Sequence, residues 1–107
     1  MTYLGEIAHR IRNNLPIDAT PPTDSDFLFL IYAVLVRAKG ELTTLEDVHD
    51  AWAAWMQTVK SDHDALVPFK DLARTVQDED IPYLEAIRRT ALELRTTNQD
   101  AADSPPA

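Results

Sequence analysis

The sequence predicts an all-α protein, a compact bundle of four main helices with one short helical turn and a disordered C-terminal tail. Apolar residues recur at spacings of three and four along four segments, which is the helical period. Proline and glycine separate these segments, and the β-rich stretches at 58–60 and 66–67 are too short to build a sheet. The chain has 107 residues, the length of one domain. We expect a single helical domain over residues 1–95 and a disordered tail over residues 96–107.

The first two helices are predicted in the N-terminal half. One apolar stripe marks the first helix, which Pro16 and the pair at 21–22 end. A second helix is expected over residues 26–39, capped within residues 23–26 and stopped by Gly40. Its apolar residues cover both sides, so we expect it to be the central, most buried element. The first stripe consists of Leu4, Ile7, Ala8, Ile11 and Leu15.

The second half predicts a third helix, a short turn and a last helix. Thr43 and Glu46 fit a capping box at the start of the third helix, over residues 45–59. A polar break at 61–64 precedes Pro68, which can begin a short helical turn through residues 72–76. Pro82 is tolerated in the first turn of the last helix. The inner stripes of these two helices are Leu45, Val48, Trp52, Trp55 and Val59, and Leu84, Ile87, Ala91 and Leu94.

Composition and charge exclude several classes of protein. There is no cysteine, so disulfides and thiolate metal sites are excluded. The net charge is -8 and the arginines are scattered, so we expect no direct nucleic-acid binding. The acidic surface serves solubility, or it imitates nucleic acid and occupies a basic protein partner. The longest apolar stretch, residues 27–36, is too short for a bilayer, so we expect no membrane association and a cytoplasmic location.

Catalytic and metal-binding signals are weak. No serine stands in a nucleophile turn, and two glycines cannot form a phosphate loop, so we expect no catalytic residues, no cofactor and no enzyme activity. Glu46 and His49 have the spacing of a carboxylate-bridged metal centre, but the motif occurs once. Asp62, His63 and Asp64 could add ligands. We favour structural roles for these residues and expect no metal site.

Two groups of residues allow both a structural and a binding interpretation. Trp52 and Trp55 lie one turn apart, so both fit the core, or one ring lines a pocket. Tyr83, Arg88 and Arg89 on the last helix could meet an anion, because a guanidinium suits phosphate or carboxylate. The more ordinary interpretation is an exposed face with ion pairs between these arginines and Glu85 or Glu93.

Residues 49–72 carry the most particular pattern of the chain. His49, Asp50 and Trp52 are followed by a second motif and then by Asp80 and the helix at 83–94. Together they resemble the RyR domain, the small module named after ryanodine receptors, over about residues 45–94. Asp64 stands where that pattern has proline, and Phe69 where it has tyrosine. The second motif consists of His63, Leu66, Val67, Pro68, Phe69 and Leu72.

The resemblance implies a non-enzymatic module that binds a nucleotide-derived or other small anionic ligand, for sensing or sequestration. The residues that it implies for the ligand are His49, Trp52, His63, Phe69 and Tyr83, with Arg88 as the anion partner. The alanine-rich, arginine-over-lysine composition is similar to that of short proteins from actinobacteria and their phages. The alternative, from charge alone, is an acidic protein-interaction module of a phage or bacterial accessory protein that docks on a basic partner.

Overall fold

A computed structural model describes the backbone of residues 2–103 and the side chains of residues 2–97. Among these residues every regular element is a helix, so the prediction of an all-α fold is confirmed. The four main helices are α1 (Tyr3–Asn14), α2 (Asp26–Ala38), α3 (Leu45–Val59) and α5 (Ile81–Asp103). The short elements are the 3-10 turns η1 (Gly40–Leu42) and η2 (Phe69–Asp71) and the helix α4 (Arg74–Asp78).

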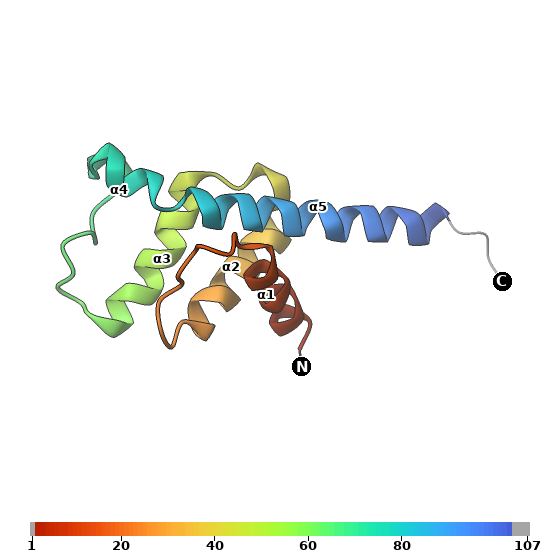
Figure 1. The fold of residues 1–107 in the computed structure, drawn as a ribbon, viewed down its shortest axis with the longest axis horizontal. Coiled ribbons are helices and arrows are strands. Elements are labelled where there is room, and N and C mark those ends of the chain that lie inside the picture. The colour runs from red at the N-terminus through yellow and green to blue at the C-terminus, as the bar shows by residue number, and fades with distance from the viewer. Residues whose placement is uncertain (1, 104–107) are drawn as a thin grey trace.

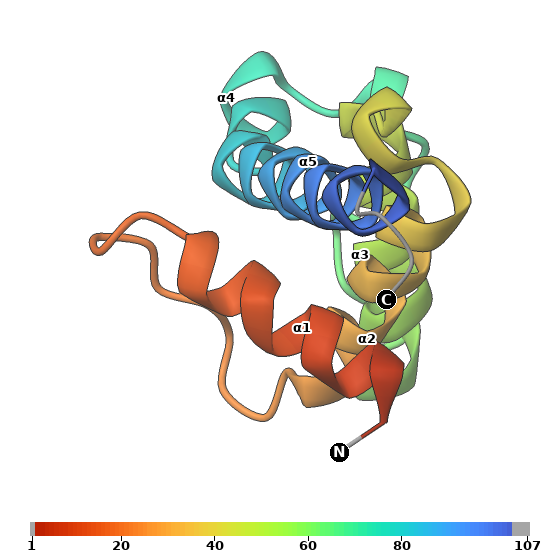
Figure 2. The ribbon, with the colours of Figure 1, turned by 90° about the vertical axis from the view of Figure 1, so that its right-hand side faces the viewer.

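The long helix α5 lies across the other helices and sets the long axis of the molecule (Figure 1). Its first half covers the body of the protein, and its second half projects beyond the body. Seen along α5, the helices α1 and α2 lie below it and α3 runs beside it (Figure 2). At the opposite end from this projection, the connection from α3 through η2 and α4 loops back to the start of α5.

All four main helices contribute to one core, with α2 at its centre in contact with α1, α3 and α5. Ile11, Phe29, Ala33, Val48 and Ile87 are fully buried. The central position of α2 agrees with its predicted role. It is not enclosed on all sides, however, because Phe27 and Val34 are 58% and 48% exposed. Apolar residues on all sides of a helix therefore do not show that other helices pack against all of its sides.

The start of α3 differs by one residue from the predicted capping box. Thr44 is the N-cap, its hydroxyl accepts from Asp47 N, and the Asp47 carboxylate accepts from Thr44 N. Thr43 is instead fully buried, and its hydroxyl donates to the carbonyl of Gly40 at 2.7 Å. Gly40 follows the C-cap residue of α2 and has φ of +57°. This left-handed conformation favours glycine and is common just after the end of a helix.

The last helix continues to Asp103, past the predicted domain end at residue 95. The end of the predicted tail, residues 104–107, lies outside the described residues. No helix within residues 2–103 has both the length and the apolar character needed to cross a bilayer.

Candidate functional site

His49 joins the third helix to the segment that follows it. Its side chain is only 3% exposed. Its Nε2 lies 2.7 Å from the carbonyl oxygen of Val67, which can only accept, so Nε2 carries the hydrogen and donates. This bond fixes the turn at Leu66, Val67 and Pro68 against α3. The structure therefore gives this histidine the anchoring role that the sequence favoured over metal binding.

His63 and Trp52 extend the same cluster. The indole of Trp52 stacks on the His49 ring, with centroids 5.6 Å apart, and meets the His63 ring edge-on at 5.1 Å. His63 Nδ1 accepts a hydrogen bond from Ala65 N at 3.0 Å. Phe69 also contacts this cluster, with its ring centroid 6.1 Å from that of His49. Four of the six predicted ligand residues therefore meet in one place.

The other two predicted residues lie elsewhere. Tyr83 belongs to an aromatic cluster with Phe29 and Tyr32, at centroid distances of 6.4 and 5.9 Å. Arg88 donates from Nε and Nη2 to the carbonyl oxygen of Thr43, at 2.9 and 2.7 Å. Its guanidinium ties α5 to the connection before α3 rather than facing the histidine cluster.

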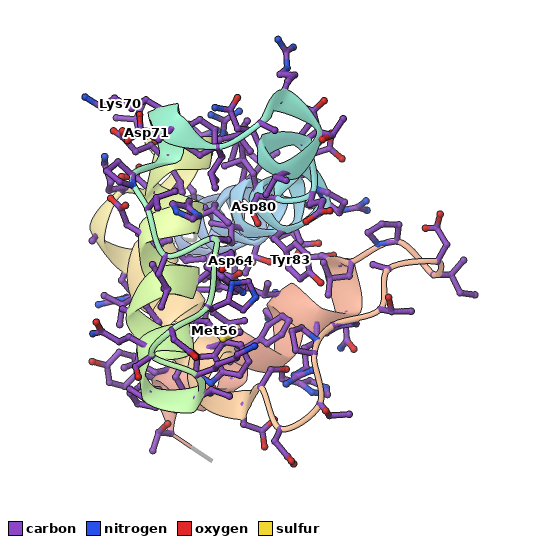
Figure 3. All side chains as sticks on the ribbon, turned by 90° about the vertical axis from the view of Figure 1, so that its left-hand side faces the viewer. Met56, Asp64, Lys70, Asp71, Asp80 and Tyr83 are labelled. Carbon is purple, nitrogen blue, oxygen red and sulfur yellow. The ribbon has the colours of Figure 1, made fainter. Side chains whose placement is uncertain are left out.

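A cavity of about 320 Å³ opens beside Trp52, between α3, the 61–72 segment, α4 and the residues that join α4 to α5. We call it the Trp52 cavity. Asp64 and Asp80, both labelled in Figure 3, line this cavity, whereas Lys70 and Asp71 lie at the far end of the 61–72 segment. The lining residues are His49, Trp52, His63, Asp64, Ala65, Leu72, Val76, Glu79 and Asp80.

The electrostatics of the Trp52 cavity are dominated by carboxylates. Burial raises the pKa of Asp80 from 3.8 to about 6, the nearby His49 opposes this rise, and Glu79 adds to it. Among residues 2–97, no side chain forms a hydrogen bond or ion pair with the Asp80 carboxylate. The carbonyl of Asp80 accepts from Leu84 N, so the residue stands at the N-cap position of α5. A half-buried carboxyl group without a donor therefore faces the cavity.

This arrangement suits a cationic group better than an anion. Asp64, Glu79 and Asp80 supply negative charge, and an indole attracts a cation to its face. His63 uses Nδ1 as an acceptor, and His49 uses Nε2 as a donor, so each histidine already has one ring nitrogen engaged. No group of three potential metal ligands occurs within the described part of the chain.

A broader groove of about 650 Å³ lies on the other side of the same turn. Asp50, Ala54 and Gln57 of α3, and Val67 and Pro68 of the turn, are all exposed along it. It is the larger hollow, but it presents no half-buried charged group. We therefore assign the candidate site to the Trp52 cavity.

The sequence predicted the side of the cavity formed by His49, Trp52 and His63, but not the side formed by α4 and the residues after it. Asp80 entered only as part of the RyR resemblance and Glu79 not at all, whereas both residues line the site. Leu72 and Val76 from the short turn also line it. The missed signal was the acidic run at 78–80, whose position opposite α3 depends on how the chain returns through η2 and α4. Of the tryptophans, Trp52 lines the cavity, and Trp55 is buried at 5% exposure.

Comparison with known proteins corrects the sequence-based resemblance. A family described as "Domain of unknown function (DUF7701)" matches residues 2–92, and no RyR domain is found. The match includes α1 and α2, which the RyR pattern did not, so both halves of the chain belong to one family unit. The RyR interpretation was therefore wrong. The most specific part of that pattern was the turn motif, and in the structure a hydrogen bond from His49 to the Val67 carbonyl holds this turn against α3.

No curated protein and no solved structure matches the chain. The family match extends over most of the sequence, and it includes α1, α2, α3 and the first half of α5. The chain belongs to the DUF7701 family, a family of domains of unknown function.

Proposed function

We propose that this protein is a binding module that receives a cationic group, an ammonium or a guanidinium, in the Trp52 cavity. The observation that carries the proposal is the Asp80 carboxyl group, which is half-buried beside an indole and has no donor among the described side chains. A cation placed there recovers the electrostatic stabilisation that burial removes from the carboxylate. The cavity volume of about 320 Å³ suits a small group or a single side chain.

The most fitting source of that group is a lysine or arginine side chain of a basic protein partner. The chain carries 18 acidic and 10 basic residues, so its field attracts a positively charged surface from a distance. Attraction of this kind raises association rates and orients the partner, while a buried contact adds specificity. The sequence's net charge already suggested an acidic interaction module, and the proposal adds the Trp52 cavity as the place where the partner binds. No catalytic step is involved.

A nucleotide-derived anion stays a prediction of the sequence, as does a cytoplasmic location. The resemblance behind the anionic ligand no longer supports it. An anion would also meet Asp64, Glu79 and Asp80 in the cavity, whose like charges repel it. Arg88, its expected partner, is occupied by the Thr43 carbonyl.

Thermal-shift measurements distinguish the two ligand classes. We expect the methyl esters of arginine and lysine to raise the melting temperature, because a ligand at 100 times its dissociation constant stabilises the native state by about 2.7 kcal/mol. We expect no shift from mono-, di- or cyclic nucleotides. Asp80→Asn should abolish the shift produced by the esters, each measured against the unliganded variant.

The matched control is Asp71→Asn, which makes the same change of charge at an exposed residue outside the cavity. It should keep the response to the esters. A response to nucleotides but not to the esters would reject the proposal, and so would an equal response from Asp80→Asn and Asp71→Asn.

A further inference from the structure

The outward face of α2 is an apolar stripe that stays largely exposed among the described residues. Phe27, Ile31, Val34 and Ala38 follow one another at spacings of three and four, so they lie along one side of the helix. Phe27 and Val34 are 58% and 48% exposed, Ala38 is exposed, and Ile31 is half-buried. No polar residue interrupts the stripe. Exposed apolar surface that is gathered in one place marks an interaction site more often than scattered exposed residues do.

Opposite charges stand at the two ends of this stripe. Asp26 begins α2 and Arg37 lies in its last turn, and the helical period places both on the flank nearest to α1. The Asp26 side chain is 99% exposed, although Arg12 Nη2 lies 2.9 Å from its Oδ1. The Arg37 guanidinium is held 5.4 Å from the ring centroid of Tyr3. Both charges are therefore positioned and remain accessible.

We propose that the α2 stripe is a homodimer interface, in which α2 packs antiparallel against α2 of a second copy about a twofold axis near Ile31 and Tyr32. A twofold interface uses the same patch on both copies, so the patch must complement itself. This axis places Asp26 opposite the partner's Arg37 and repeats that pair on the other side. It also places Phe27 against the partner's stripe between Val34 and Ala38.

The arrangement of charge selects a second copy as the occupant. A stripe with an acid at one end and a base at the other matches its own reversed image, and an antiparallel helix pair supplies that image. A crossing angle of about 20° would keep the two helices in contact along the stripe. The proposal is independent of the Trp52 cavity, whose lining includes no residue of α2.

Sedimentation of the full chain from micromolar to millimolar concentration tests the apolar contact. We expect the wild-type protein to dimerise and Val34→Asp to remain monomeric at every concentration. Val34 is 48% exposed, so the variant should keep its helical circular dichroism. Ile17→Asp, at a fully exposed loop position, is the matched control and should dimerise like the wild type. A monomeric wild type, or a Val34→Asp variant that still dimerises, overturns the proposal.

Charge exchange tests the antiparallel register. Asp26→Arg and Arg37→Asp should each weaken self-association about tenfold, because two exposed pairs become repulsive in the symmetric dimer. Mixing the two variants should restore dimerisation, since the new arginine at position 26 then faces the new aspartate at position 37, and the unchanged residues also pair. Failure of the mixture to associate more tightly than either variant alone overturns the proposed register.

Discussion

At the scale of single residues, Asp80 is the side chain whose environment departs furthest from that of an ordinary surface carboxylate. It stands at the N-cap position of α5, where the helix dipole favours negative charge. Burial nevertheless raises its pKa to about 6, so the loss of water outweighs the favourable dipole. The proposed ligand supplies the opposite charge that the native contacts do not.

The raised pKa of Asp80 should make the free energy of unfolding depend on pH. Asp80 binds its proton more tightly when folded, so its contribution is favourable below the unfolded pKa near 3.8 and is lost as pH rises through about 6. Asp80→Asn should therefore be more stable than the wild type at pH 7, by about 1–2 kcal/mol after allowance for partial solvent screening. The difference should vanish below pH 4.

Urea denaturation of both proteins from pH 3.5 to 7.5 measures that difference. His49, His63, Asp64 and Glu79 line the cavity together with Asp80, but they are present in both proteins, so their effects largely cancel in the difference. A difference that is independent of pH would contradict the assigned burial of Asp80.

The two tryptophans should separate stability from binding. Trp55→Ala empties a buried site in the core and should cost about 3–5 kcal/mol in urea denaturation. Trp52→Ala removes a half-buried ring, so it should cost less, but it should abolish the thermal shift from the arginine ester. Equal costs with the ester response intact would place Trp52 in the core and not at the site.

At the scale of secondary-structure elements, the start of α3 depends on Thr44. Thr44→Ala removes the hydroxyl that accepts from Asp47 N and should destabilise the protein by about 1 kcal/mol. Glu46→Gln should change stability little, because Glu46 is exposed and Asp47, not Glu46, completes the capping box. Thermal unfolding of the two variants distinguishes this structure from the box predicted on Thr43 and Glu46. A larger effect of Glu46→Gln would contradict the observed cap.

The main helices were predictable because their signals are local. The stripes at Ile7 and Ile11, or at Val48 and Trp55, encode their own buried faces, and prolines or Gly40 mark the breaks between helices. The meeting of His49 with Trp52 also follows from helical spacing, since the two are three residues apart. The contact of His63 with Trp52 depends on how the 61–72 segment folds back on α3, which helical spacing does not give.

The remaining features required the tertiary fold. Asp80 faces His49 only because η2 and α4 return the chain to α3, and no spacing rule gives that path. The bond from Arg88 to the Thr43 carbonyl joins residues 45 positions apart, so the helix sequence around Arg88 does not show it. The exposed side of α2 was missed for a similar reason, because apolar residues at Phe27 and Val34 predict burial without naming a neighbour.

At the scale of the whole molecule, negative charge opposes the compact state. The net charge is -8, and the five ion pairs seen among the described residues lie mostly on exposed side chains, where each contributes about 0–1 kcal/mol. Screening should therefore reduce self-repulsion more than it weakens these pairs. Binding of a basic partner should instead weaken as salt is added, because salt screens the attraction between the two proteins.

We expect the melting temperature to rise as sodium chloride is increased from about 0.01 M to about 0.15 M, where the Debye length falls from about 30 Å to about 8 Å. Differential scanning calorimetry at constant pH measures the change. A melting temperature that falls over this range would show that the ion pairs outweigh the repulsion.

The central claim is that a cation enters the Trp52 cavity, and the two indole N–H signals of the protein test it most directly. Titration with arginine methyl ester at pH 7.5, followed by two-dimensional NMR, should shift the Trp52 indole signal in a saturable way. The Trp55 signal should stay in place as an internal reference, and Asp80→Asn should lose the response. An unmoved Trp52 signal in the wild-type protein, or equal shifts of both indoles, would contradict the account.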